Sequence, residues 1–195
     1  KDTNPAEYST KSDTMAWYHM NEGNPSPPTY PGEYAAMDST LAWYHFSEGT
    51  DTTTIDVGGV ISDTGTLNGA TWTTGLYGSG LSFNGTNGRV TVPDSADLNP
   101  QTGLTVEAWV NPSVQKPNNY VITKVTTDGS DYSYGLKLEN TYTPGNSEIG
   151  GWIRDPAGNI YFAYGGSVPL NTWTHIAMTY QVDPTGPSHI NLYRN

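Results

Sequence analysis

The sequence predicts an all-β sandwich. Short apolar stretches recur along the chain, and Gly, Pro, Asn and Asp punctuate them as turns punctuate strands. The 195 residues include 22 Gly and 14 Pro, but also 14 Tyr and 6 Trp, which is the composition of a folded protein and not of a disordered polymer. No stretch has the periodicity of an amphipathic helix. A chain of this length suits one domain with an extension.

The N-terminal region carries a duplicated, strand-like decapeptide. "TMAWYHMNEG" (14–23) and "TLAWYHFSEG" (40–49) are identical at seven of ten positions. Between them, "NPSPPTYPGEY" (24–34) has four prolines in eleven residues and favours an extended, stiff linker. We therefore divide the chain into an N-terminal extension (1–36) and a β domain (37–195). A single repeated strand cannot bury its own face, so at least one copy needs a partner from elsewhere.

The strands of the β domain follow in order. Alternation in "LTVEAWV" (104–110) places Leu104, Val106, Ala108 and Val110 on one face and Thr105, Glu107 and Trp109 on the other. "LSFNGTNGRVTVP" (81–93) has Asn-Gly turn chemistry between two apolar pairs and predicts a β-hairpin. Further strands are predicted at 134–138, 149–155, 159–166, 173–182 and 189–195.

Five short motifs follow one another in a defined order along the β domain. They are "WYHFSEG" (43–49), "GTLNGATW" (65–72), "GSGLSFNGTNGRVTVP" (78–93), "TVEAWVNP" (105–112) and "WTHIAMTY" (173–180). In this order they resemble the laminin G-like branch of the concanavalin A-like lectin/glucanase family. The resemblance implies an antiparallel, two-sheet jelly roll.

The resemblance also implies that the last strands are missing. In that family a segment like "NLYRN" (191–195) is followed by a return strand and a closing strand, which lies beside the opening strand. Either the jelly roll lacks these strands, or the sequence continues beyond Asn195. Both cases leave open sheet edges, which soluble proteins normally cover.

The duplication then suggests an assembly strand. If residues 41–46 form the opening strand, the first copy has no place within its own jelly roll. Insertion into the next subunit would complete a neighbour's sheet and propagate as a head-to-tail filament. The alternative is that the first copy packs on its own domain or stays loose. The assembly strand consists of Met15, Ala16, Trp17, Tyr18, His19 and Met20.

Charge and composition limit the partners. The net charge of −11 disfavours nucleic acid, whose phosphates would be repelled. The absence of Cys removes disulfides and thiolate metal sites. No apolar run approaches the ~18 residues of a membrane span. The first residue, Lys1, fits a processed secreted protein or a trimmed chain, and we expect an extracellular or cell-surface location. "NGT" (84–86) is a glycosylation sequon, meaningful only where the source has the machinery.

Enzymatic activity is not expected. Glucanases of this fold carry an E-x-D-x-E strand, whose paired carboxylates act as nucleophile and acid/base. No such triplet occurs in the sequence. Glu107 stands alone on its strand and is interpreted as a solvent- or groove-facing residue. His175 has no nucleophile motif beside it and is interpreted as part of the framework.

Calcium and glycans remain as ligands. The resemblance implies a calcium site where the loop after the opening strand meets the sheet rim, at Asp56 and Asp63. Surface aromatics either stack on sugar rings or pack within the sandwich. We therefore expect a non-enzymatic extracellular protein that assembles into filaments, or alternatively a calcium-assisted glycan-binding adhesion module. The possible glycan-contacting residues are Tyr142, Trp152, Tyr161 and Tyr164.

Overall fold

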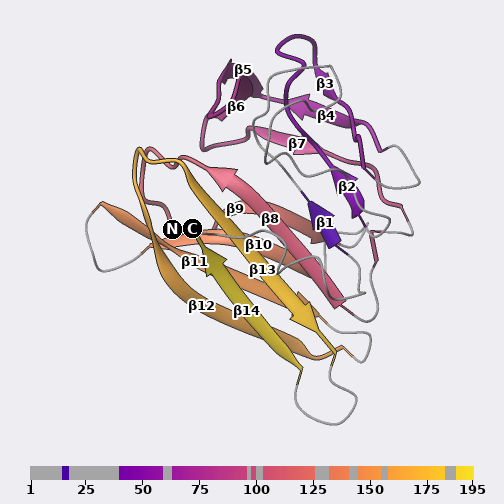
Figure 1. Ribbon diagram of the computed structural model, residues 1–195, viewed down its shortest axis with the longest axis vertical. Coiled ribbons are helices and arrows are strands. Elements are labelled where there is room, and N and C mark those ends of the chain that lie inside the picture. Colours follow the sequence, from indigo (N-terminus) through magenta and orange to yellow (C-terminus); the bar gives the residue numbers. More distant parts are fainter. Residues whose placement is uncertain are drawn as a thin grey trace.

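The computed structural model confirms the predicted all-β architecture. It describes residues 15–17, 40–58, 63–95, 98–99, 103–125, 132–140, 145–154, 158–182 and 188–195. Their regular structure is entirely β-strand (Figure 1). In this part of the chain there is accordingly no helix long and apolar enough to cross a membrane. The predicted strands from residue 104 to residue 194 are all present.

One layer of the sandwich is a five-stranded sheet. The sheet order is β14 (His189–Arg194), β13 (Thr174–Gln181), β8 (Gly103–Val110), β1 (Met15–Trp17) and β2 (Thr40–Trp43). Strands β8, β13 and β14 pair antiparallel, whereas β1 runs parallel to both β8 and β2.

The position of β1 corrects one expectation. The first copy of the decapeptide does have a place in its own sheet, because Met15–Trp17 lies between β8 and β2 of the same chain. The second copy lies directly beside it, with Trp17 paired with Trp43. β2 and β8 would otherwise present two open edges inside one sheet, and β1 supplies the backbone partners that both require. Tyr18, His19 and Met20 lie outside the described residues.

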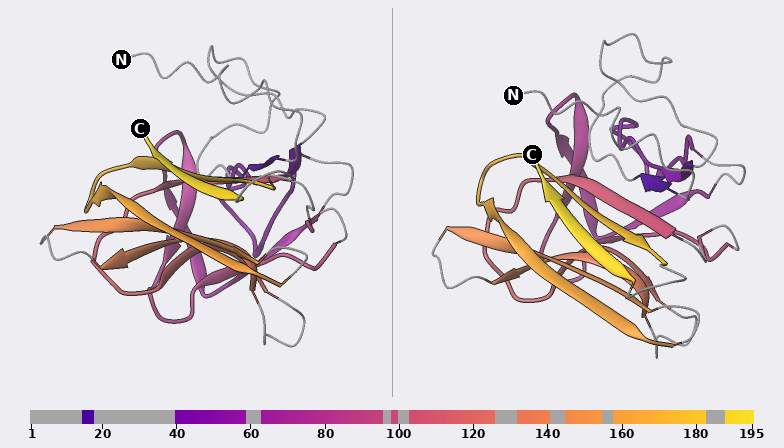
Figure 2. Two further views of the ribbon diagram at one scale, coloured as in Figure 1. Left: turned by 90° about the horizontal axis from the view of Figure 1, so that it is seen from below. Right: turned by 60° about the horizontal axis from the view of Figure 1, so that its bottom comes forward.

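The other layer is a four-stranded antiparallel sheet. Figure 2 shows its strands β11 and β12 below β13 and β14 of the first layer. Strand β12 forms one edge of this sheet and β9 the other. The sheet order is β12 (Ile160–Pro169), β11 (Asn146–Arg154), β10 (Tyr132–Asn140) and β9 (Asn119–Val125).

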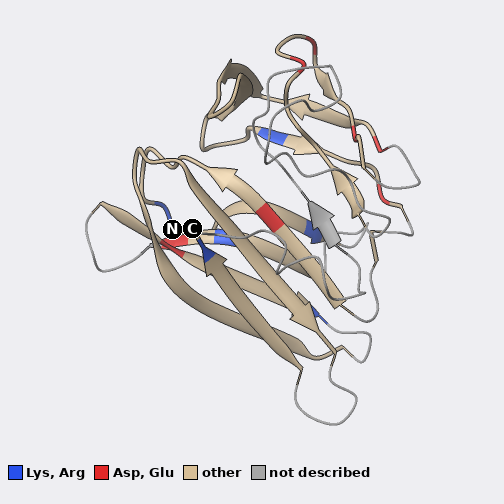
Figure 3. Ribbon diagram, viewed as in Figure 1, with Lys and Arg blue, Asp and Glu red and all other residues tan. Residues whose placement is uncertain are grey.

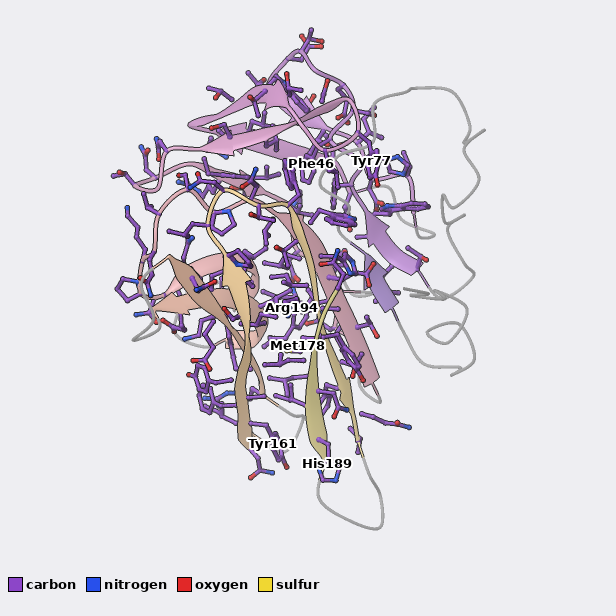
Figure 4. The ribbon with its side chains drawn as sticks, turned by 60° about the vertical axis from the view of Figure 1, so that its left-hand side comes forward. Phe46, Tyr77, Tyr161, Met178, His189 and Arg194 are labelled. Atoms are coloured by element: carbon purple, nitrogen blue, oxygen red, sulfur yellow. The ribbon has the colours of Figure 1, made fainter. Side chains whose placement is uncertain are left out.

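The main core fills the space between the two layers. Val106 and Leu136, from opposite sheets, are both fully buried in it. Met178 of β13 lies between the layers in Figure 4. The alternation predicted for residues 104–110 is confirmed for this face. The opposite face of β8 is also covered, so Glu107 is buried and not solvent-facing as interpreted from the sequence.

The hairpin predicted at residues 81–93 is wrong in its pairing. Strand β6 (Ser79–Phe83) pairs with β5 (Ala70–Thr74), whereas β7 (Arg89–Thr91) pairs with β4 (Gly65–Asn68). The physical reason is a bend in both chain segments. At this corner each segment passes from one small sheet to the other. Gly69, with φ 66°, bends one segment, and the loop at 84–88 bends the other. Strand β3 (Thr53–Thr54) completes the small sheet with β4 and β7.

Asn84 organises this corner. Its Oδ1 accepts hydrogen bonds from the backbone N–H groups of Thr86, Asn87 and Gly88. Its Nδ2 donates to Asn87 Oδ1 at 2.7 Å. The amide of the sequon therefore holds the loop through both its oxygen and its nitrogen, as Asx-type turns use such side chains.

Candidate functional site: the outer face of the four-stranded sheet

One row of residues crosses all four strands on the outer face of this sheet. Tyr120 of β9 pairs with Lys137 of β10, Lys137 with Gly150 of β11, and Gly150 with Tyr164 of β12. Three strand spacings separate the backbones of the two tyrosines by about 14 Å, and the Tyr164 ring leans over Gly150 toward the centre of the row. Both rings are open to solvent, with 48% and 54% of their surface exposed. The row therefore carries an exposed aromatic ring at each end.

Two glycines make the middle of this face flat. The Trp152 ring lies directly over Gly135, where a Cβ atom would come within 1.8 Å of the ring. At Gly150 a Cβ would come within 3.0 Å of Lys137 Cε and 3.1 Å of Tyr164 Cε1. A side chain at position 135 would displace the indole, whereas one at position 150 would require the lysine stem and the Tyr164 ring to shift slightly. Trp152 is thereby packed to 6% exposure and supports the face from beneath.

Lys137 is the cation at the centre of the face. Its Nζ lies 5.9 Å from the Trp152 ring centroid and 5.5 Å from that of Tyr164, within range of cation–π attraction. The same ammonium pairs with the Glu139 carboxylate and lies 3.3 Å from Asn118 Oδ1. Burial by itself would lower the pKa of Lys137, but the hydrogen bond and charge of Glu139 outweigh it and raise that pKa.

Glu139 links this cation to the neighbouring loop. One oxygen contacts Lys137, and Oε2 accepts a hydrogen bond of 2.8 Å from the backbone N–H of Asn118. Asn118 has φ 52°, a left-handed conformation that asparagine tolerates better than most residues. Burial tends to raise the pKa of Glu139, but the Asn118 N–H and the Lys137 ammonium together lower it. The carboxylate is thus ionised and held on both sides.

The four aromatic residues that the sequence suggested as glycan contacts do not lie together on one face. Tyr164 is on the outer face, and Trp152 lies beneath it as a support. Tyr161 points the other way, packs against the main core, and has its ring 6.0 Å from that of Tyr180 (Figure 4). Tyr142 lies outside the described residues. The sequence reasoning missed Tyr120 and the lysine at the centre.

The sequence carried a signal for Lys137 but none for Tyr120. Lys137 interrupts the apolar strand "YGLKL" at a position that alternation places opposite Leu136 and Leu138. Trp152 and Tyr120 then meet edge to face, with ring centroids 5.5 Å apart. That contact depends on the register of β9, β10 and β11, which alternation within one strand does not specify.

The two predicted calcium ligands lie near each other beside β2. Asp56 is nearly buried, and its Oδ1 accepts hydrogen bonds from the backbone N–H groups of Trp43 (2.7 Å) and Gly58 (2.8 Å). Asp63 Oδ2 accepts a hydrogen bond of 2.7 Å from Ser95 Oγ. Its backbone oxygen accepts one of 2.5 Å from the Tyr44 hydroxyl. Burial raises the pKa of Asp56, and the backbone N–H groups of Trp43, Gly58 and Asp63 only partly offset this.

This donor set does not fit calcium. The ion requires six to eight oxygen ligands. Asp56 Oδ1 and Asp63 Oδ2 already accept hydrogen bonds from the protein, and Asp56 Oδ2, although buried with no close hydrogen-bond partner, supplies only one ligand. Within the described ranges no group of three or more His, Asp or Glu side chains could hold a metal. Asp56 instead fixes the segment at 56–58 against the end of β2, where Tyr44 forms an isolated bridge with Asp56.

Charged residues are otherwise sparse on the strands, as Figure 3 shows. On the described strands of the five-stranded sheet, Glu107 of β8 is the one acidic residue and Arg194 of β14 the one Lys or Arg. Glu107 is 2% exposed and faces His175 of the adjacent strand β13. His175 in turn stacks against Trp109, with ring centroids 5.3 Å apart. The two residues interpreted separately from the sequence therefore form one small cluster.

Comparison with known proteins identifies the family of the chain. Neither the curated proteins nor the solved structures contain a match. A family model described as the concanavalin A-like lectin/glucanases superfamily matches residues 84–195, more than half of the sequence. The match includes β7 to β14 and so all four strands of the outer face that carries Tyr120, Lys137 and Tyr164, which we call the aromatic face. The chain belongs to the concanavalin A-like lectin/glucanases superfamily, as a laminin G-like domain.

Proposed function

We propose that the chain is a non-enzymatic, carbohydrate-binding adhesion module of an extracellular or cell-surface protein. The observation that carries the proposal is the pair of exposed tyrosines, Tyr120 and Tyr164, on either side of Lys137. Membership of a superfamily that joins lectins and glucanases supports carbohydrate as the class of ligand.

The chemistry of the face suits a sugar. A pyranose ring has an apolar side of C–H groups, which an exposed tyrosine ring can cover, and a rim of hydroxyl groups that need hydrogen bonds. Ligand sites of this kind combine aromatic surface with a few placed polar groups. The amide nitrogen of Asn118 and the Glu139 carboxylate can supply a donor and acceptors, and the little-exposed ammonium of Lys137 holds both groups in place. Because Glu139 orients the Asn118 backbone, these groups are fixed before a ligand arrives.

The same face argues against hydrolysis. Glu148 stands opposite Glu139 in register, so two carboxylates lie on neighbouring strands. Glycoside hydrolases need one carboxylic acid with a raised pKa and a second carboxylate that is free to act. Glu139 meets neither need, because its pKa is lowered and Lys137 and the Asn118 N–H already hold it. Incubation with laminarin, cellulose and chitin oligosaccharides should therefore release no shorter products.

The experiment that tests the proposal compares two exposed tyrosines. Isothermal titration with neutral oligosaccharides should show binding by the wild-type chain and a several-fold loss for Tyr164→Ala, since an aromatic contact contributes about 0.5–1.5 kcal/mol. Tyr77→Ala is the matched control. Tyr77 is 57% exposed and lies in the turn between β5 and β6, at the opposite end of the molecule from Tyr161 (Figure 4). Equal loss for both variants, or no binding by the wild type, would refute the proposed site.

A second function, self-assembly by strand exchange, is favoured by one specific observation. β1 is inserted between β8 and β2 and is joined to β2 only through residues 18–39. That connection can reach up to about 70 Å if fully extended. The slot between β8 and β2 can therefore take β1 from its own chain or from a neighbour, and exchange along a row of subunits would form a head-to-tail filament.

Deletion of residues 1–24 tests strand exchange. The deletion removes β1, and the filament hypothesis predicts that it leaves only single or short assemblies in electron micrographs. A control with a scrambled segment at 24–34 keeps β1 and the linker length. Wild-type particles that are monomeric at every concentration, or fibres of undiminished length after the deletion, contradict exchange.

A further inference from the structure

We infer that the aromatic face binds an uncharged oligosaccharide that spans from Tyr120 to Tyr164, and neither a single sugar nor an acidic glycan. This inference rests on the proposed carbohydrate-binding function and names its class of ligand. Two independent features carry it, the spacing of the exposed rings and the balance of charge on the face.

The spacing requires a chain of sugars. Tyr120 and Tyr164 lie on the outermost strands, β9 and β12, with their backbones about 14 Å apart and the ring of Trp152 and the stem of Lys137 between them. A single pyranose ring is too small to cover both. Between them the surface is formed by the buried Trp152 and Lys137, which are 6% and 7% exposed. A ligand that gains stacking energy at both tyrosines must therefore cross the strands and pass over this flat middle.

The exposed aromatic surface continues along β12. Phe162 is 60% exposed and lies two residues from Tyr164, on the same side of the strand. It pairs with Trp152 across the sheet, as Tyr164 pairs with Gly150. The β12 end of the face thus offers two adjacent rings and the β9 end one. A flexible chain with several apolar faces matches this arrangement better than one compact ligand.

The charges on the face cancel. Lys137 and Arg154 are offset by Glu139 and Glu148, which the pairing of β10 and β11 places on the same side of the sheet. Lys137 is already paired with Glu139, and its ring contacts leave it little exposed. An acidic sugar would have to compete with Glu139 for this ammonium and approach a chain with net charge −11. Neutral hydroxyl groups meet neither obstacle.

The test is a titration of the intact chain with probes that differ in length and charge. Glucose, a trisaccharide and a hexasaccharide of a β-glucan and of chitin form the neutral series. A galacturonic acid hexamer is the charged probe of equal length. Affinity for the neutral series should rise at least tenfold from the single sugar to the hexasaccharide, because a second stacking contact forms within one complex. The galacturonic acid hexamer should bind at least tenfold more weakly than the neutral hexasaccharides.

Single-residue variants test whether the preference for longer saccharides depends on Tyr120 and Tyr164. Tyr120→Ala and Tyr164→Ala should each lower hexasaccharide affinity and reduce its advantage over the trisaccharide. Tyr120→Phe and Tyr164→Phe keep the rings and should retain that advantage, and Tyr77→Ala should behave as wild type. Circular dichroism verifies that each variant is folded.

The outcomes of the titration distinguish failure of this inference from failure of the proposed carbohydrate-binding function. Equal affinity for glucose and hexasaccharide, or tighter binding of the galacturonic acid hexamer, overturns the inference and leaves carbohydrate binding intact. A wild-type chain that binds none of the saccharides removes the proposed function as well.

Discussion

The Glu107 carboxylate lies 3.4 Å from His175 Nε2, in a part of the five-stranded sheet where Glu107 has almost no contact with solvent. This distance is long for a charge-assisted hydrogen bond. Burial raises the pKa of Glu107, and the hydrogen bond and charge of His175 only partly offset the effect. Ionisation of Glu107 therefore costs the folded state stability.

The pH dependence of stability should reveal this cost. Because the folded-state pKa of Glu107 lies above its ordinary value of 4.5, protonation favours the folded state. Its contribution to stability is fully present below the ordinary value and is lost as pH rises through the folded-state pKa. Glu107→Gln should raise the melting temperature at pH 7 and weaken the pH dependence in that window. A lower melting temperature at pH 7, with an unchanged pH profile, would show that the ionised pair stabilises the fold.

Asp56 should act through its hydrogen bonds. Asp56→Ala removes the acceptor for the backbone N–H groups of Trp43 and Gly58, and each hydrogen bond to a charged group contributes about 1.5–3 kcal/mol. We expect the free energy of unfolding to fall by roughly 2–4 kcal/mol, measured by urea denaturation. Asp56→Asn keeps one oxygen acceptor and removes the buried charge, so it should lose clearly less. Equal losses in the two variants would contradict this role.

Calcium should leave the fold unchanged. A ligand that binds the folded state raises the melting temperature in proportion to the logarithm of its concentration. Since the described oxygens near Asp56 and Asp63 do not fit the ion, we expect the same melting temperature with added calcium and with a chelator. A rise with calcium that disappears in Asp63→Asn would establish the site that the sequence suggested.

A cavity in the main core should be costly. Ile176 of β13 is fully buried between the layers, so Ile176→Ala should lower the free energy of unfolding by roughly 2–4 kcal/mol. Ile160→Ala, at a half-exposed position on β12, is the matched control and should lose less than about 1 kcal/mol. Equal losses in the two variants would show that Ile176 is not part of the main core.

The sequence predicted what depends on alternation and missed what depends on register. The inward face of β8 follows from residues 104–110 alone, because every second side chain points the same way. Alternation also puts Tyr161 and Tyr164, three residues apart, on opposite faces, so they could not form one site. The pairing of β6 with β5 and of β7 with β4 depends on the corner at Gly69 and Asn84. That corner resembles an ordinary Asn-Gly turn in the sequence.

For the aromatic face, too, the sequence predicted a single residue but not the association of residues from different strands. Tyr164 was identified as a surface aromatic, and it is exposed. Its association with Tyr120 and Lys137 arises only when β9, β10, β11 and β12 come into register, across loops whose lengths differ. The position of β1 is a further case. Its near identity with β2 indicated that it fits this sheet, but not that it would lie parallel to β2 within one chain.

Gly135 should determine whether the aromatic face exists at all. A methyl group at this position would come within 1.8–2.5 Å of three carbons of the Trp152 ring, a distance that real Cβ atoms do not reach. In Gly135→Ala the indole must therefore leave its place over β10 and give up its contacts with Tyr120 and Lys137. We expect a shift in tryptophan fluorescence, a loss of roughly 1–3 kcal/mol in unfolding free energy, and weaker oligosaccharide binding.

Trp152→Leu alone should also weaken binding, because it removes the support beneath Tyr120 and Tyr164. The double variant Gly135→Ala/Trp152→Leu relieves the clash, so its stability loss should be smaller than the sum of the single losses. Additive losses would mean that the ring does not rest on Gly135 in solution.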